Sequence, residues 1–126
     1  MIYKEELQQI KRAKIEVLLK DNNYPEDLAN FFRYSSVKSQ VCLLGYFSSI
    51  NNFLNWCKQE EIFDNFNDIR NVKPSHVVKY LNGLIDNGYK NSTVVTIQNQ
   101  LSSFFNYLVE EDLIDKSQFI KRNKKL

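Results

Sequence analysis

The stretch NSTVVTIQNQLSSFFNYL, residues 91–108, decides the fold class of this chain. Its apolar residues recur at steps of three or four, with one adjacent pair, which is the period of one helix face: Val94, Ile97, Leu101, Phe104, Phe105 and Leu108. The alternation of two that marks a strand appears neither here nor elsewhere in the sequence. Asn91 or Ser92 is expected to cap this helix by accepting backbone N–H bonds.

Two helices are expected before residue 36. The first carries five apolar residues at helical spacing: Tyr3, Leu7, Ile10, Ala13 and Val17. Turn-forming residues 21–23, followed by Pro25, end it. Pro25 is also well placed to open a second helix, residues 26 to about 33, because a proline in the first turn forfeits no hydrogen bond.

A third and a fourth helix are expected in the middle of the chain. The third, about residues 37–60, is the longest, and its apolar stripe should be core: Leu43, Phe47, Ile50, Phe53, Leu54 and Cys57. A loop with apolar anchors follows at 63–69. Pro74 then opens the fourth helix, Asn87-Gly88 stops it, and its apolar face comprises Val77, Leu81, Leu84 and Ile85. With a short last helix at about 116–120, the sequence predicts an all-α orthogonal bundle of about four to six helices.

Size and charge bound the class of protein. The chain has 126 residues, of which 43% are hydrophobic and 25% charged, as in one ordinary globular domain. It contains neither a run of roughly 18 apolar residues nor a signal region, so a cytoplasmic location without a membrane is expected. Cys42 and Cys57 lie roughly 22 Å apart along one helix, too far for a disulfide. The net charge of +2 hides a mildly acidic body and a basic end, residues 116–126.

The residues for bond chemistry are missing from the sequence. The three glycines are isolated, so no phosphate-cradling loop is expected, and one histidine with two cysteines cannot supply a zinc site. His76 has no assignable nucleophile or carboxylate partner, and a surface or capping role is expected for it. Carboxylates at 60–64 and 110–112 are typical of solvated helix ends. We expect no catalytic residue, metal, cofactor or small-molecule substrate.

Three stretches in order give the chain a resemblance to a known family. They are FSSINNFLNWCK at 47–58, the segment from Asp68-Ile69 through KPSHVVKYLNGL at 73–84, and the helix at 91–108 with its continuation to Ile114. This order and spacing resembles the N-terminal SAM-like, or core-binding, domain of tyrosine recombinases, the phage integrase family. The chain departs from the pattern at Asp115-Lys116-Ser117, where Asn-Pro is common, and it lacks the family's catalytic constellation of arginines, lysine, histidine and tyrosine.

The resemblance implies a domain division and a function. Residues 36–115 would form the core-binding domain, 1–35 an added helical extension, and 116–126 a basic tail or linker. In relatives this domain and a catalytic domain close around DNA as a C-shaped clamp. Here the chain itself would be a DNA-binding module and not an enzyme. Its partners would be duplex DNA and neighbouring recombinase protomers.

Two helices of the domain enter the major groove in relatives, and these would be the third and the fifth. The candidate DNA-binding residues are Lys38, Ser39, Gln40, Lys90, Ser92, Thr93, Thr96, Asn99, Gln100 and Ser103. The alternative is a helical protein–protein interaction module without DNA binding. A large exposed patch built from Tyr3, Leu7 and Ile10 would favour that alternative.

Overall fold

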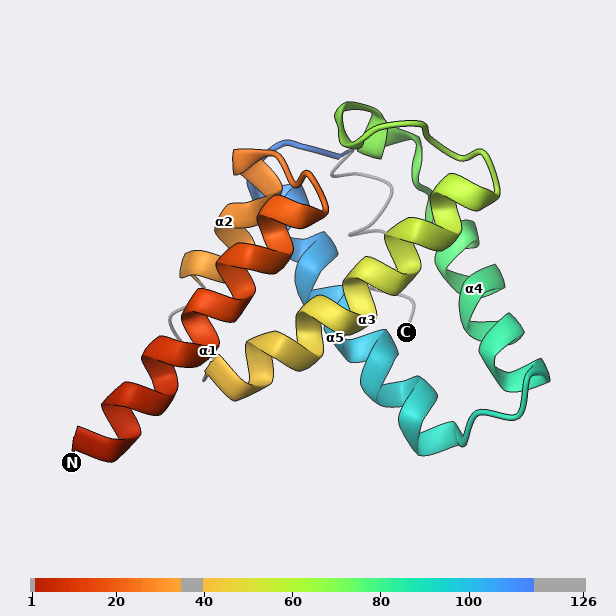
Figure 1. Ribbon diagram of the computed structural model, residues 1–126. Coiled ribbons are helices and arrows are strands. Elements are labelled where there is room, and N and C mark those ends of the chain that lie inside the picture. Colours follow the sequence, from red (N-terminus) through yellow and green to blue (C-terminus); the bar gives the residue numbers. More distant parts are fainter. Residues whose placement is uncertain (1, 35–39, 115–126) are drawn as a thin grey trace. The chain divides into compact units, whose positions relative to one another are not determined.

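The computed structural model describes residues 2–34 and 40–114, which form helices and no strand (Figure 1). The elements are α1 (Ile2–Asp21), α2 (Glu26–Tyr34), α3 (Gln40–Gln59), the 3-10 helix η1 (Phe66–Asn71), α4 (Pro74–Asp86) and α5 (Asn91–Glu110). The all-α fold class is therefore confirmed. The helix expected at about 116–120 lies outside the described residues. The chain divides into two compact units, Met1–Ser48 and Ser49–Leu126.

In the first unit, α1 and α2 pack together as a helical hairpin (Figure 1). The core is mostly aromatic: the Phe32 ring lies 5.9 Å from the Tyr24 ring and 5.4 Å from the Phe47 ring, all between centroids. Ile15 and Leu19 bring α1 into this core, and both side chains are buried. Burial of these side chains removes apolar surface from water and is what holds a helix of this length in place.

The apolar face expected for the first helix is wrong where the structure describes it. Ile10 and Val17 are 54% and 57% exposed, and Ala13 is exposed as well. The helix carries two apolar rows, and the structure buries the row that contains Ile15 and Leu19. Periodicity alone does not rank two rows, because only the position of α2 decides which of them is covered.

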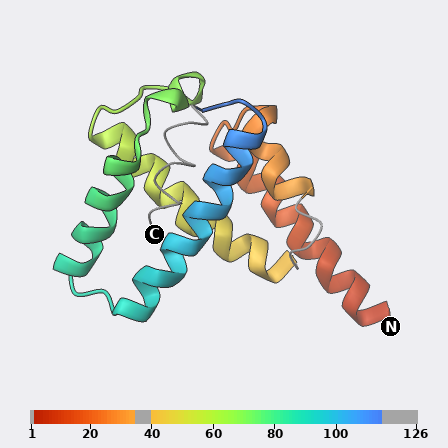
Figure 2. The ribbon, with the colours of Figure 1, turned by 180° about the vertical axis from the view of Figure 1, so that it is seen from behind.

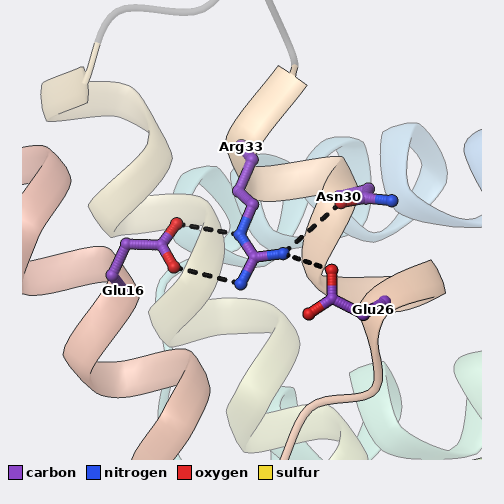
Figure 3. A network of polar contacts seen from close by, with 4 residues as sticks. All are labelled: Glu16, Glu26, Asn30 and Arg33. Carbon is purple, nitrogen blue, oxygen red and sulfur yellow. Dashed lines mark hydrogen bonds and ion pairs between the residues drawn. The ribbon is translucent and has the colours of Figure 1, made fainter.

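A polar network joins α1 to α2 (Figure 3). The Arg33 guanidinium of α2 donates to both carboxylate oxygens of Glu16 on α1, at 2.8 and 3.0 Å. It also donates to Glu26 at 2.7 Å and to the side-chain oxygen of Asn30 at 3.5 Å. The hydrogen bonds that Arg33 donates to Glu16 raise the pKa of Arg33 most, so the guanidinium stays charged. The two-pronged geometry fixes how α2 lies along α1.

The second unit is built on Phe53 of α3. Its ring lies 5.1 Å from the Tyr80 ring of α4 and 5.8 Å from the Phe105 ring of α5, both nearly perpendicular. Figure 2 shows the ribbons of these three helices from behind. The described stripes expected for the third and fifth helices are confirmed, with Ile97 only half-buried. The anchors of the loop at 63–69 are buried too: Phe63, Phe66 and Ile69. On α4, Leu81 is buried, whereas Ile85 is 46% exposed and does not belong to the core.

Helices α1, α3, α4 and α5 end in the same backbone motif. After α4, the Tyr89 N–H donates to the Leu84 carbonyl at 3.1 Å and the Gly88 N–H to the Ile85 carbonyl at 3.0 Å. This motif needs one left-handed residue, which is Gly88 here, with φ +91°, as the sequence predicted. At the other three ends the left-handed residues are Asn23, Glu61 and Asp112. Each end thereby satisfies carbonyls that a helix otherwise leaves open.

The start of α4 confirms a capping role for His76. The His76 Nδ1 accepts a hydrogen bond from the Lys73 backbone N–H at 3.0 Å, and the His76 N–H donates back to the Lys73 carbonyl at 2.9 Å. Only a ring with an unprotonated Nδ1 can accept this bond. Burial, and then the charges of Lys73 and Lys79, lower the pKa of His76 below its ordinary 6.5.

Gly83 inside α4 and Gly88 just past its end provide a matched test of the backbone argument. Gly88→Ala is expected to lower the free energy of unfolding by about 1 kcal/mol, because alanine resists a positive φ. Gly83→Ala is expected to raise it by roughly 0.5–1 kcal/mol, because Gly83 lies inside the helix and an added Cβ meets no atom within 4 Å. Urea unfolding followed by circular dichroism measures both; two changes of the same sign would contradict this account.

His76 is the single histidine of the sequence, so a change in stability caused by histidine titration can be assigned to it. The folded state favours the neutral ring, so the contribution of His76 to stability is complete above about pH 7. This contribution is lost as the pH falls below 6.5 and through the lowered pKa of His76. The loss in the free energy of unfolding should reach about 1 kcal/mol, the value of one hydrogen bond. His76→Gln keeps an acceptor without a titrating ring. Unfolding measured between about pH 5 and 7.5 should show this step in the wild type and not in the variant; equal profiles would refute it.

Candidate nucleic-acid interface

Helix α5 has one buried face and one exposed face, and the exposed face is the candidate interface. Its buried face includes Leu101, Phe104, Phe105 and Leu108. Opposite to these, exposed residues recur at steps of three or four, with one adjacent pair: Ser92, Val95, Thr96, Asn99, Ser102 and Asn106. The exposed face is therefore a continuous strip along the helix, which we call the α5 strip.

The α5 strip contains no charged side chain. No Asp, Glu, Lys, Arg or His occurs between Lys90 and Glu110, although a quarter of the chain is charged and 19 average residues would hold about five such side chains. The exposed part of α1, by contrast, presents Lys14, Glu16 and Lys20. Exposed helix faces normally carry charges of both signs, so a strip of hydroxyls, amides and one valine is unusual for a surface in contact only with water.

A second uncharged strip runs along α3. The exposed residues there are again small and polar, at helical spacing: Gly45, Ser48, Asn52 and Asn55. The sequence holds no charged residue between Lys38 and Lys58. Both helices that the sequence analysis assigned to the candidate interface therefore lack charge over most of their length. This absence of charge can be read from the sequence alone.

The first turn of α5 points backbone N–H groups outward. The first helical hydrogen bond runs from the Val94 N–H to the Lys90 carbonyl at 3.0 Å, so the N–H groups of residues 91–93 precede the helical ladder. Lys90 occupies the capping position and no side chain closes the end, so the cap expected from Asn91 or Ser92 is wrong. Residues 90–93 are all exposed. This turn therefore combines a lysine with backbone donors and the positive end of the helix dipole.

The structure places the candidate DNA-binding residues unequally. Lys90, Ser92, Thr93, Thr96 and Asn99 are exposed. Gln100 and Ser103 are half-buried, and the Gln100 Oε1 is fully buried and has no hydrogen-bond partner. Gln40 begins α3, whereas Lys38 and Ser39 lie outside the described residues. The sequence analysis missed seven exposed members of the two strips: Val95, Ser102, Asn106, Gly45, Ser48, Asn52 and Asn55.

Thr96 uses its only donor inside the helix. Its hydroxyl donates to the Ser92 carbonyl at 3.0 Å, one turn earlier. Because that bond takes the single hydroxyl proton, Thr96 has only oxygen lone pairs and a methyl group left for a ligand. Thr96 can therefore accept a hydrogen bond or make an apolar contact, but it cannot donate.

Acidic residues gather at the opposite end of α5. The Arg70 guanidinium of η1 donates to the Asp112 carbonyl at 3.4 Å, and the Asn71 side chain donates to the Ile62 carbonyl at 3.3 Å. These contacts bring η1 to the ends of α3 and α5, where acidic residues cluster: Glu60, Glu61, Asp64, Asp68, Glu110, Glu111 and Asp112. Helix geometry puts Lys90 about 30 Å from Glu110. The end of α5 is thus rich in carboxylates, whereas its start carries Lys90 and the positive end of the helix dipole, which favours an anion there.

Reactive groups are poorly placed for chemistry in the described part of the chain. Burial raises the pKa of the Cys57 thiol to about 12, so the thiol stays protonated at neutral pH. Burial also raises the pKa of Tyr80, with smaller effects from Tyr89 and Cys57. Among residues 2–34 and 40–114, no three His, Cys, Asp or Glu side chains form a metal-binding group. None of the helices described is both long and apolar enough to span a bilayer.

Comparison with known families identifies the chain. The model of the family described as "Phage integrase, N-terminal SAM-like domain" matches residues 31–115, which include α3, η1, α4 and α5. Comparisons with curated proteins and with solved structures find no significant match. The family match covers more than half of the chain and both uncharged strips. The chain therefore belongs to the phage integrase family of tyrosine recombinases, with an N-terminal SAM-like domain at residues 31–115.

Proposed function

We propose that this chain is the DNA-binding module of a site-specific tyrosine recombinase and grips duplex DNA at the core site as one half of a clamp. The observation that carries the proposal is the uncharged α5 strip, which begins at an exposed lysine and open backbone donors in a member of the integrase family. No cofactor or metal takes part in this function. Cutting and rejoining of DNA would belong to a catalytic domain that the family match does not include.

The two ends of the interface would have different tasks. Lys90 and the first-turn N–H groups would hold a phosphate, which sets the position of α5 without reading sequence. The hydroxyls and amides farther along the α5 strip would then face base edges in the major groove. Lys38, Ser39 and Gln40 would hold phosphate in the same way at the start of α3. The acidic ends of α3 and α5 would point away from the duplex, because like charges repel.

The domain division is part of the same proposal. Residues 36–115 would make up the core-binding domain, and residues 1–35 would add a helical extension that joins it. The basic segment 116–126, with five basic and no acidic residues, would lead away along the phosphate backbone. The chain would thus act as a positioning module for duplex DNA.

A salt titration tests the proposal. The chain should bind a duplex of about 20 base pairs weakly and with a strong dependence on salt, because few phosphates are neutralised. Lys90→Ala should weaken binding and reduce the slope of log K against log salt by about one, the value for one lost phosphate contact. Lys38→Ala should act alike. Fluorescence anisotropy at several salt concentrations measures both quantities.

Lys14→Ala is the matched control, because Lys14 is an exposed lysine of α1 outside both strips. It should leave the slope and the affinity unchanged. Absence of binding at low salt, or an equal loss in all three lysine variants, would count against DNA gripping by these helix starts.

A second candidate function rests on the exposed apolar residues of α1. Ile10, Ala13 and Val17 are exposed at steps of three and four, which is one helix face. An apolar face without a partner favours contact with another protein, and a neighbouring recombinase protomer is the partner we propose. Tyr3 and Leu7, which the sequence analysis grouped with Ile10, have side chains outside the description.

A measurement of self-association tests this second candidate function. If α1 contacts a second copy, the chain should show a concentration-dependent mass by sedimentation equilibrium, and Val17→Glu should abolish it. Val78→Glu changes an equally exposed valine of α4 and should have no effect. A wild-type chain that stays monomeric up to several hundred micromolar, or equal effects of both variants, would exclude the candidate.

A further inference from the structure

We infer that the α5 strip reads A·T base pairs, so that the preferred ligand of this chain is duplex DNA rich in A·T pairs at the contacted positions. The inference rests on the proposed function, since it assumes that α5 enters the major groove. It goes beyond that function because it names the base pairs that the strip selects.

The α5 strip lacks the side chains that read G·C pairs. In the major groove, guanine presents two acceptors, which arginine or lysine contacts best, and cytosine presents an amino donor, which aspartate or glutamate accepts. The 19 residues between Lys90 and Glu110 include none of these four residue types. Lys90 lies at the capping position of α5, before its first turn. The strip therefore has no strong reader for either base of a G·C pair.

The side-chain amide of Asn99 is the candidate reader of adenine. Asn99 is exposed near the middle of the strip. An asparagine side-chain amide carries an acceptor oxygen and a donor NH2 group on the same carbon. The oxygen can accept from the amino group of adenine while the NH2 group donates to N7, which gives a two-bond contact. The same amide makes no matching pair of bonds with guanine, whose N7 and O6 are both acceptors. Asn99 therefore favours adenine at the position that it faces.

Val95 and Thr96 supply the apolar groups of the α5 strip. Val95 is 52% exposed on a strip that is otherwise polar, where contact with water gains nothing from its methyl groups. Thymine is the base with a methyl group in the major groove, and small apolar groups contact it. Thr96 adds to this, because its hydroxyl proton is bound to the Ser92 carbonyl and its methyl group remains available. Val95 and Thr96 thus form an apolar contact point for thymine.

The spacing of Val95 and Asn99 fits the spacing of base pairs in a duplex. Val95 and Asn99 lie one helical turn apart, which corresponds to about 6 Å along the helix axis. Successive base pairs of a duplex are stacked about 3.4 Å apart. A helix in the groove would therefore present its apolar point and its amide to base pairs that are neighbours or next neighbours. The α3 strip also exposes asparagines, Asn52 and Asn55, and no charge, so it would share this preference.

The experiment compares duplexes of equal length and equal phosphate number with the full 126-residue chain. One duplex has an A·T-rich centre, one a G·C-rich centre, and in a third every thymine of the first is replaced by uracil, which lacks the methyl group. Anisotropy titrations at one low salt concentration should give at least about fivefold tighter binding to the A·T-rich than to the G·C-rich duplex, as one good base contact provides. Uracil should weaken binding about two- to fourfold, as the loss of one buried methyl contact does.

Variants assign each effect to its residue. Asn99→Ala should remove most of the A·T preference without changing affinity for the G·C-rich duplex. Val95→Ser should abolish the difference between thymine and uracil. Asn82→Ala is the matched control, an exposed asparagine on α4, and should leave all three affinities unchanged. Circular dichroism melts establish that each variant is folded.

The outcomes separate this inference from the function on which it rests. Salt-dependent binding with equal affinity for A·T- and G·C-rich duplexes, or with tighter binding to G·C, overturns the inference and leaves the proposed function standing. A preference for A·T that persists in both Asn99→Ala and Val95→Ser also overturns it, because the strip would then not be the reader. Failure to bind any of the duplexes overturns the proposed function and the inference together.

Discussion

The contacts of Phe53 with Tyr80 and Phe105 are the constraint on which unit 2 depends. One ring of α3 is held against one ring from α4 and one from α5, each at a steep angle. A ring in a packed core cannot move sideways without leaving a void, and voids cost several kcal/mol for a phenylalanine. Phe105 therefore fixes the rotation of α5 about its own axis. That rotation turns Val95, Asn99 and Ser102 outward, so the core sets the composition of the exposed strip.

On the surface of unit 2, charged side chains and neutral polar side chains occupy different parts of α5. Charges are kept at helix ends, with Lys90 at the start of α5 and carboxylates at its finish, while the middle of the helix is neutral. A neutral strip of short side chains lets a helix approach a ligand closely and avoids the cost of stripping water from ions. In the proposed function, phosphate attraction and base reading would fall to different residues. The small net charge of +2 is compatible with a DNA partner for this reason.

The limits of sequence reasoning are visible in particular residues. Periodicity found the buried faces of α3 and α5, because large apolar residues there recur in a single row. It failed on α1, where two rows compete, and on Ile85, which continues the apolar row of α4 past the point where the core ends. The glycine signal found the end of α4, but Glu61 and Asp112 take the same left-handed conformation without such a signal. The candidate interface was approached through polar residue types, and Val95 was overlooked because a valine beside the apolar Val94 usually indicates core.

The sequence by itself determined the all-α class, the order of the helices, the absence of charge in residues 91–109 and the family resemblance that the family match confirms. These properties depend on residue identity and on spacing along the chain, which a local pattern preserves. Tertiary structure alone decided which row of α1 is covered, that Gln100 has its Oε1 turned into the protein, and that η1 brings the acidic ends of α3 and α5 together. Those outcomes depend on contacts between residues far apart in the chain, because burial is a property of the neighbours that a side chain meets.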